Sequence, residues 1–471
     1  MKLDRTFGLW SAVSIVIGGI IGSGIFMKPA LMASQVGSPL LLIGIWVFAG
    51  VLTLLGALSN AEVAAMMPET GGQYVFFQKM YGDFIAFLYG WAAFAVFNTA
   101  GVASIAYIFA TYAEYFVKLP RLSADAEKIV YLFIPGIGRI YPFENLGVKS
   151  LTILVIGGLT LVNYRSTRSG GKLQVVFTAL KIAAIAFLIV GLLFSPNGSA
   201  HNIVTPSTTH HLTGWPLIIA IVAATSGAFW GYDGWNNVTF IAGEIKNPRR
   251  NIHLALLLGL TATIAVYGLL NLAFVYMLPI DRIASSNLVA SDAATVAFGY
   301  IGGGLIAAMV IVSTFGTTNG NILATARVSF AMALEKRFFS WTGVVHPRFH
   351  TPGNALVLHA LWTSLLVLSG SFDMLTDMLV FVSWLFYGLS AFGVFILRRK
   401  MPDAERPYRV WGYPFVPALF VIATVIFLVL TLFHDINDYW AGRTPLINSL
   451  FGLLLTALGI PLYWYFRRVN K

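Results

Sequence analysis

The chain of 471 residues is 58% hydrophobic and only 10% charged, and it contains no cysteine. Soluble domains carry about 25% charged residues. This composition therefore excludes an ordinary soluble protein and predicts an all-α integral membrane protein with many spans. The absence of thiols excludes disulfides and thiolate metal sites. We assign the formal net charge of +11 to cytoplasmic loops rather than to nucleic-acid binding.

Twelve apolar spans follow one another along the chain, and we expect the first to act as an uncleaved insertion signal. They are roughly 9–32, 39–66, 84–116, 150–165, 173–195, 214–241, 254–278, 298–332, 354–369, 374–397, 413–434 and 445–466. An even number of spans puts both termini on one side. The basic residues of alternate loops, such as Arg398-Arg399-Lys400, predict that this side is the cytoplasmic face of the cell (inner) membrane.

The first span has an unusual centre, with Gly18-Gly19 followed one turn later by Gly22-Ser23-Gly24. Glycine inside a helix costs roughly 1 kcal/mol relative to alanine. This pattern predicts a break at bilayer depth, which occurs only where the freed backbone groups face protein, water or a ligand. The alternative is an unbroken helix that packs closely through its small residues.

Span six contains a second weak point, the stretch Trp230-Gly231-Tyr232-Asp233-Gly234-Trp235-Asn236. A carboxylate at membrane depth costs several kcal/mol unless it has partners, and two glycines lie close to Asp233. We interpret the stretch as a local unwinding. The alternative is a continuous helix whose polar face lines the bundle.

The two weak points lie five spans apart, each in the first span of a half. Interrupted segments in corresponding positions of two halves indicate a transporter site built from inverted repeats, because a repeat of five spans inverts the second half. We therefore predict a ten-helix core within 1–400, with repeats at about 9–195 and 214–397. Residues 401–471 add helices 11 and 12.

Several stretches resemble the amino acid–polyamine–organocation (APC) superfamily, in particular its L-type amino acid transporter (LAT) branch and its bacterial serine/threonine-exchanger-like members. The residues that carry the resemblance are Ile20-Ile21-Gly22-Ser23-Gly24-Ile25-Phe26, Tyr232-Asp233-Gly234-Trp235-Asn236, the stretch 244–251, Phe315-Gly316-Thr317-Thr318-Asn319-Gly320 and His350-Thr351-Pro352. The resemblance implies a LeuT-like fold with discontinuous helices 1 and 6. It also implies amino acid transport by obligatory exchange.

A broken helix offers complements to both charges of an amino acid. Amide groups at Ser23-Gly24-Ile25, where the second half-helix starts, would hold the carboxylate. The free carbonyls that end each first half-helix, those of Ile20, Ile21, Trp230 and Gly231, would accept from the ammonium.

Two polar residues of the second break have open roles. Asp233 either pairs with the ammonium or a cationic side chain, or stays bound to the unwound backbone. Asn236 binds within the unwound segment or to the substrate. The resemblance further implies that Trp230 covers the site as an outer gate.

Lys181 lies within span five, and an intramembrane lysine is a functional candidate by default. The resemblance implies that its ammonium replaces a sodium ion, reaching carbonyls near Gly18-Gly19 and a hydroxyl such as that of Thr317. The alternative is that Lys181 carries a proton.

We therefore expect a sodium-independent exchanger of small or medium neutral L-amino acids, with no cofactor and no metal site. The alternatives are a proton-coupled symporter and a transporter of cationic amino acids or polyamines. An enzyme would need convergent His, Asp or Glu clusters, and a channel would need a pore lined by repeated rings. Eukaryotic light subunits of the LAT branch are joined to a heavy subunit through a cysteine. Since this chain has none, we expect no such partner.

Overall fold

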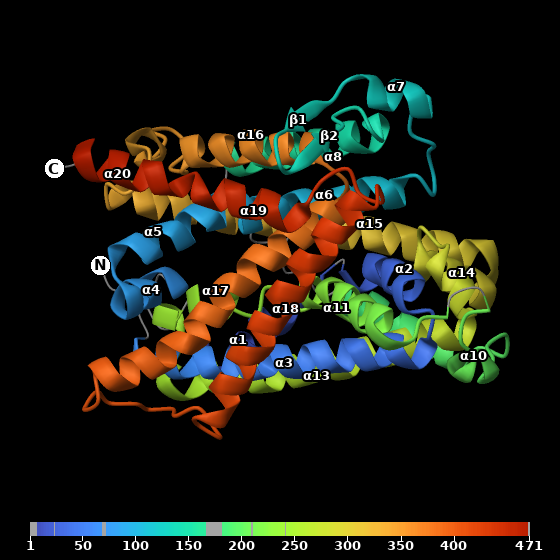
Figure 1. Ribbon diagram of the computed structural model, residues 1–471, viewed down its shortest axis with the longest axis horizontal. Helices are drawn as coiled ribbons and strands as arrows, with labels where there is room; N and C mark the ends of the chain where they lie inside the picture. The colour runs from blue at the N-terminus through green and yellow to red at the C-terminus, as the bar shows by residue number, and fades with distance from the viewer. Residues whose placement is uncertain are drawn as a thin grey trace.

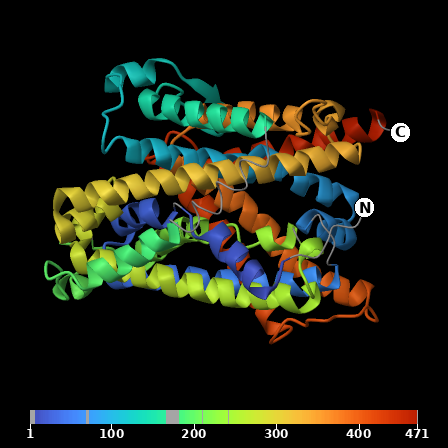
Figure 2. The same ribbon diagram turned by 180° about the vertical axis from the view of Figure 1, so that it is seen from behind.

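The structure is a computed structural model that describes residues 7–22, 24–67, 72–165, 181–208, 211–240 and 242–469. These residues form a bundle of long helices with one small β-hairpin on its side (Figure 1). The view from behind shows α13 and α15 running along the length of the bundle (Figure 2).

The first half of the chain contains an interrupted helix, three long spans and a hairpin loop. Its elements are α1 (Leu9–Ile20), α2 (Gly24–Val36), α3 (Pro39–Met66), α4 (Gln73–Tyr81), α5 (Asp83–Ala92), the π-helix η1 (Ala93–Phe97), α6 (Asn98–Ala113), α7 (Ala124–Ile129), β1 (Leu132–Ile134), β2 (Gly138–Ile140), α8 (Leu146–Arg165) and the helix Lys181–Leu193. β1 and β2 pair antiparallel.

The second half repeats the pattern of a helix interrupted early and followed by long spans. Its elements are α10 (His201–Val204), α11 (Gly214–Gly231), α12 (Asn237–Phe240), the 3-10 helix η2 (Ala242–Glu244), α13 (Pro248–Met277), α14 (Ile280–Ala284), α15 (Val289–Leu334), the 3-10 helix η3 (Ser340–Gly343), α16 (Gly353–Ser369), α17 (Phe372–Lys400), α18 (Phe415–Trp440), α19 (Asn448–Ala457) and α20 (Gly459–Val469).

Nine helical segments of the described chain are long and apolar enough to cross a membrane, and the bent pair α1–α2 makes a tenth. Two shorter apolar helices, Lys181–Leu193 and α16, lie among them. The order of these segments follows the order of the predicted spans. The count of twelve crossings stays a prediction.

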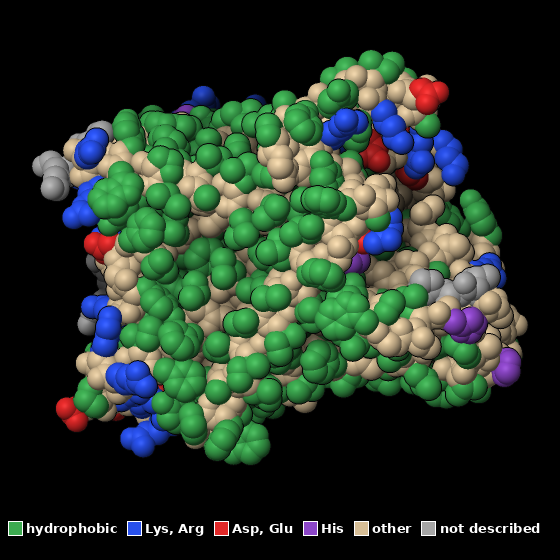
Figure 3. All heavy atoms as spheres, in the orientation of Figure 1, with side chains coloured by type: hydrophobic (Ala, Val, Ile, Leu, Met, Phe, Trp, Pro, Cys, Tyr) green, Lys and Arg blue, Asp and Glu red, His purple; other side chains and the backbone are tan. Residues whose placement is uncertain are grey.

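The face of the bundle seen in Figure 3 is mostly apolar over its middle, and most of its charged side chains lie towards the two ends. On α18 the side chains of Leu419, Ile422, Val425, Val429 and Phe433 are all about half exposed, and their spacing of three and four residues puts them on one helix face. Such a stripe has no place on a water-soluble protein. It is the lipid-facing side of a multi-pass membrane protein.

Local sequence determines where several spans begin. Ser38 accepts a hydrogen bond from the amide of Leu41 at the start of α3, and Pro39 follows it at the first helical position. Ser371 caps α17 in the same way. These residues satisfy amides that a helix start leaves without an internal partner.

A buried carboxylate ties α3 to α17. Glu62 is 1% exposed and receives two hydrogen bonds from Arg398, at 2.9 and 2.8 Å, and one from the amide of Val410 at 2.7 Å. Arg406 Nε lies 3.5 Å from the same carboxylate, and the guanidinium of Arg398 lies 3.6 Å from the ring centre of Tyr413. These contacts of Glu62 connect α3 with α17 and with the loop that follows α17.

We predict that Glu62→Gln lowers the free energy of unfolding by about 3 kcal/mol. Breaking a buried ion pair leaves the partner charges uncompensated, and the partial exposure of Arg398 keeps the loss at the lower end of the usual range. Thermal unfolding of the detergent-solubilised protein measures the effect. As a control, Glu405→Gln breaks the exposed pair between Arg249 and Glu405 and should cost less than about 1 kcal/mol. Equal losses in both variants would contradict the assignment.

Candidate functional site

The first predicted break is a gap between two helices. α1 ends at Ile20, α2 begins at Gly24, and the two are bent by 45°. Ile21 and Ile25 are buried on either side of the gap. Ser23, the predicted carboxylate ligand, lies outside the described residues.

The second predicted break is a run of turns. α11 ends at Gly231, and the helix resumes only at Asn237. Gly234 has a φ of +98°, a conformation that residues with a Cβ rarely adopt. The chain therefore leaves the helix where the sequence pattern predicted that it would.

The two breaks lie against each other with almost no side chain between them. A Cβ on Gly19 would lie 3.0 Å from the carbonyl oxygen of Gly234, and one on Gly24 would lie 2.9 Å from the Cα of Gly231 and 2.8 Å from the ring of Trp230. Close packing through small residues and a broken helix were alternatives in the sequence. The structure contains both.

Tyr267 of α13 joins the ends of the two half-helices. Its hydroxyl lies 3.0 Å from the carbonyl oxygen of Ile20 and 3.0 Å from that of Gly231, and its ring is fully buried. Both carbonyls are among the predicted ammonium acceptors. The sequence analysis missed Tyr267, because nothing in the sequence around a single tyrosine of an apolar span indicates that its hydroxyl contacts the ends of two other helices.

A group of aromatic and charged side chains, which we call the Trp230 cluster, lies beside α2 and the start of α17: Lys28, Trp230, Phe372, Asp373 and Asp377. Trp230 packs edge-on against Phe372, with 5.1 Å between ring centres. The fully buried ammonium of Lys28 lies 4.9 Å from the centre of the Phe372 ring. It also lies 2.7 Å from Asp373 and 3.7 Å from Asp377. The sequence analysis named Trp230 but not the other four members of this group, although Asp373 and Asp377 stand one helical turn apart in the sequence.

The polar residues of the second break bind neighbouring helices. Asp233 accepts a hydrogen bond of 2.6 Å from the hydroxyl of Tyr387 on α17. Asn236 donates to Gln73 at the start of α4, at 3.4 Å, and Tyr89 donates to the same amide oxygen at 2.9 Å. Side chains thus connect the unwound segment to α4, α5 and α17.

Beside Gln73, Tyr74 takes part in a polar group at the C-terminal end of α15. Its hydroxyl donates to Glu335 at 3.2 Å and accepts from Arg337 at 3.1 Å. Burial raises the pKa of Tyr74 to about 12. The hydroxyl therefore keeps its proton at physiological pH and remains a donor.

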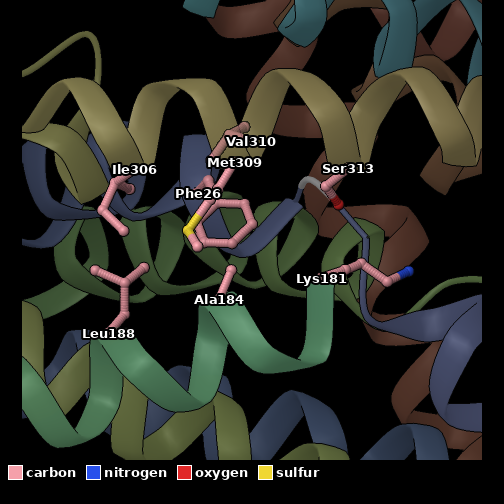
Figure 4. Close-up of a pocket in the computed structure, with 8 residues that line it drawn as sticks. All are labelled: Phe26, Lys181, Ala184, Leu188, Ile306, Met309, Val310 and Ser313. Carbon is pink, nitrogen blue, oxygen red and sulfur yellow. The ribbon is translucent and has the colours of Figure 1, made fainter. Parts of the chain in front are cut away.

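Lys181 lies beside the first break. Its ammonium donates a hydrogen bond of 3.1 Å to the carbonyl oxygen of Gly18. Lys181 is 3% exposed and lies at one end of a small cavity, next to Ser313 (Figure 4). The cavity is lined by Phe26, Lys181, Ala184, Leu188, Ile306, Met309, Val310 and Ser313.

Two hydroxyls of α15 lie one helical turn apart near this cavity. The hydroxyl of Thr317, which the resemblance implied as a partner of Lys181, bonds to the carbonyl of Ser313 on its own helix at 2.9 Å. Ser313 itself lines the cavity with Lys181, and its buried hydroxyl has no hydrogen-bond partner among the described residues. Ser313 is therefore the α15 hydroxyl that faces the lysine end of the cavity.

Paired interruptions of two apolar helices inside a multi-span bundle define a secondary transporter. Residues 7–454 match the sequence profile of the family described as Amino acid permease. The chain belongs to this family, and the predicted membership of the APC superfamily is confirmed.

Three relatives match over most of the chain. The serine/threonine exchanger SteT of Bacillus subtilis (strain 168) is 32% identical over 98% of this chain and 97% of its own. The b(0,+)-type amino acid transporter 1 of Homo sapiens is 30% identical over 91% of this chain and 82% of its own. The cystine/glutamate transporter of Homo sapiens is 30% identical over 99% of this chain and 86% of its own. The relatives are amino acid transporters and not enzymes.

We predict that Tyr267→Phe lowers the free energy of unfolding by about 1 kcal/mol, because a buried hydrogen bond to a helix-end carbonyl is lost. Thermal unfolding of the purified protein measures the change. Tyr276→Phe removes a hydroxyl from the same helix and serves as the control. Equal stability of the two variants would show that the bridge between the half-helices contributes nothing.

Proposed function

We propose that the protein exchanges L-amino acids across the cell membrane by alternating access, without sodium, with both termini in the cytoplasm. Small and medium neutral amino acids are the proposed substrates. The observation that carries the proposal is the contact between two helix breaks, with the ammonium of Lys181 bonded to the backbone beside the first.

In the proposed site the substrate lies between the half-helix ends. The amides at Ser23, Gly24 and Ile25 hold its carboxylate at the positive end of α2. The carbonyls of Ile20, Ile21, Trp230 and Gly231 receive its ammonium. The hydroxyl of Tyr267 is bonded to two of these carbonyls, so we infer that the arriving ammonium displaces it.

The proposed inverted repeat is supported by which spans pack together. The first span contacts the sixth (α2 with α11) and the second contacts the seventh (α3 with α13). The third contacts the eighth (α6 with α15) and the fourth contacts the ninth (α8 with α16). Corresponding members of two halves related by a pseudo-twofold axis meet in this way near the axis.

The proposed independence from sodium rests on Lys181. Its ammonium is a fixed positive charge that is bonded to a carbonyl of the first break. A cation held by the protein at this place removes the need for a dissolved one. Proton-coupled symport is the alternative, in which Lys181 releases its proton during the cycle.

The proposed preference for neutral substrates rests on Asp233. Its carboxylate is engaged by Tyr387, which favours a structural role in the unwound segment over pairing with a cationic side chain. Two of the relatives are named as transporters of serine and threonine and of cystine and glutamate. Transport of cationic amino acids or polyamines is the alternative in which Asp233 exchanges Tyr387 for the substrate.

Counterflow in proteoliposomes tests the proposed function. We expect uptake of labelled L-serine into vesicles preloaded with unlabelled amino acid, and unchanged uptake when choline replaces sodium outside. A panel of unlabelled competitors then defines the substrate class. Uptake into empty vesicles that follows an inward proton gradient would support the symporter instead.

We predict that Lys181→Ala reduces exchange at least tenfold, because the carbonyl of Gly18 loses its cation. If Lys181 replaces sodium, added sodium should partly restore exchange in this variant and have no effect on the wild type. Counterflow with sodium or choline outside measures both. An unchanged rate in Lys181→Ala would remove the lysine from the proposed cycle.

We predict that Gly24→Ala abolishes exchange, because the added carbon meets the backbone of Gly231 and the ring of Trp230. Gly22→Ala is a matched control in the same break, since among the described residues its Cβ would meet only the carbonyl oxygen of Ile20, at 3.6 Å. Substrate-dependent thermal stabilisation separates lost binding from lost folding. Normal exchange by Gly24→Ala would refute the proposed packing of the site.

A further inference from the structure

The segment between α6 and α8, residues 116–143, exposes an unusual number of apolar side chains. We call it the outer hairpin segment. Its exposed apolar residues are Phe116, Val117, Leu122, Ile129, Val130, Tyr131, Leu132, Phe133 and Phe143. A loop with this composition lies against another apolar surface or against lipid.

The hairpin in this segment is firmly attached to the bundle. The amide of Arg139 donates to the carbonyl of Pro445 at 2.7 Å, and the amide of Ile447 donates to the carbonyl of Ile137 at 2.9 Å. Ile137 and Ile140 are buried. β2 is thus held at the start of α19, and β1 forms the outer edge of the sheet.

One face of the hairpin points away from the protein and combines aromatic rings with a positive charge. Phe133 is the cross-strand partner of Arg139, so the two side chains lie on the same face. The guanidinium of Arg139 lies 5.0 Å from the ring centre of Tyr131. Tyr131 and Phe133 are 50% and 53% exposed. Large rings beside an arginine are typical of the interface between lipid and water.

The apolar surface of the hairpin continues the lipid-facing surface of the helices. Leu154 on α8 is 70% exposed, and Leu361 and Leu365 on α16 are 62% and 57% exposed. The ribbon shows β1 and β2 alongside α8 and α16 (Figure 1), and the space-filling view shows apolar and basic side chains in this region, with some acidic side chains among them (Figure 3).

The backbone of β1 determines how deep the hairpin can lie. In the part of the chain that the structure describes, β1 pairs with β2 alone, so its outer edge offers unpaired amides and carbonyls. Such an edge does not occur in the hydrocarbon core, where no water is present to satisfy it. The headgroup layer supplies both water and acyl-chain contact, which suits the edge and the rings together.

The charges of the segment indicate the kind of headgroup. Lys118, Arg121, Lys128 and Arg139 are exposed. Arg121 is paired with Glu114 at 2.8 Å. The segment has two carboxylates against these four cations: Asp125 is exposed, and Glu127 is partly exposed and accepts a hydrogen bond of 2.9 Å from the amide of Asn145. The balance is positive, which complements the phosphates of anionic lipids.

We propose that the outer hairpin segment is a binding surface for anionic phospholipid headgroups of the outer leaflet. Tyr131 and Phe133 lie at the level where the acyl chains begin, and Arg139 and Lys128 contact the phosphates. The proposal is independent of which amino acid is carried.

The absence of cysteine makes a depth measurement direct. Phe133→Cys introduces a unique site for an environment-sensitive fluorophore, and Tyr131→Cys offers a second site should the first variant fail to fold. In liposomes we expect quenching by nitroxide-labelled lipid and little quenching by aqueous iodide. Ser285→Cys, just after α14 and exposed, is the control and should show the reverse. A Phe133 label as accessible to iodide as the Ser285 label would overturn the proposal.

A second experiment tests the charge preference with the same label. Nitroxide-labelled phosphatidylglycerol should quench it more than nitroxide-labelled phosphatidylcholine at equal density. The double substitution Lys128→Gln with Arg139→Gln should reduce the preference for phosphatidylglycerol about fivefold for each charge removed. The control Arg399→Gln, at the C-terminal end of α17, should leave this preference unchanged. Shielding from both quenchers that grows with the protein-to-lipid ratio would identify a second copy of the chain and overturn the lipid assignment.

Discussion

Backbone meets backbone where the two interrupted helices cross, and the rest of the bundle is arranged around that contact. The carbonyl oxygen of Gly234 lies where a Cβ of Gly19 would be crowded, and the Cα of Gly231 lies where a Cβ of Gly24 would be. Such an approach is possible only between residues without side chains. It leaves several helix-end groups in the middle of the bundle, and each needs a partner there because no water is available in hydrocarbon.

Buried charges gather around this contact and each has a partner. The ammonium of Lys28 is paired with Asp373, and that of Lys181 is bonded to the carbonyl of Gly18. Asp233 accepts from Tyr387. Charged groups within a membrane protein persist where they are paired or bonded to backbone. The partners of Lys28 and Asp233 both lie on α17, so this helix contacts both the second break and the Trp230 cluster.

The order of the spans and both breaks were predictable, because apolar length and glycine clusters are local properties of a sequence. Lys181 was singled out for the same reason, as a charge inside an apolar run. The partners were not predictable. Tyr267, Phe372 and Ser313 acquire their places only through the crossing of helices that are far apart in the chain. Asp373 and Lys28 are 345 residues apart in the sequence, and helical periodicity relates only residues within the same helix.

The hydroxyl of Tyr267 has a single proton, yet it stands at hydrogen-bond distance from two carbonyl oxygens. The hydroxyl can therefore donate to only one of these two oxygens at a time. An ammonium brings three donors to the same place: two would satisfy both oxygens, and one would remain for a third. In the proposed site, the ammonium of the substrate would therefore supply the second hydrogen bond that the tyrosine hydroxyl cannot donate.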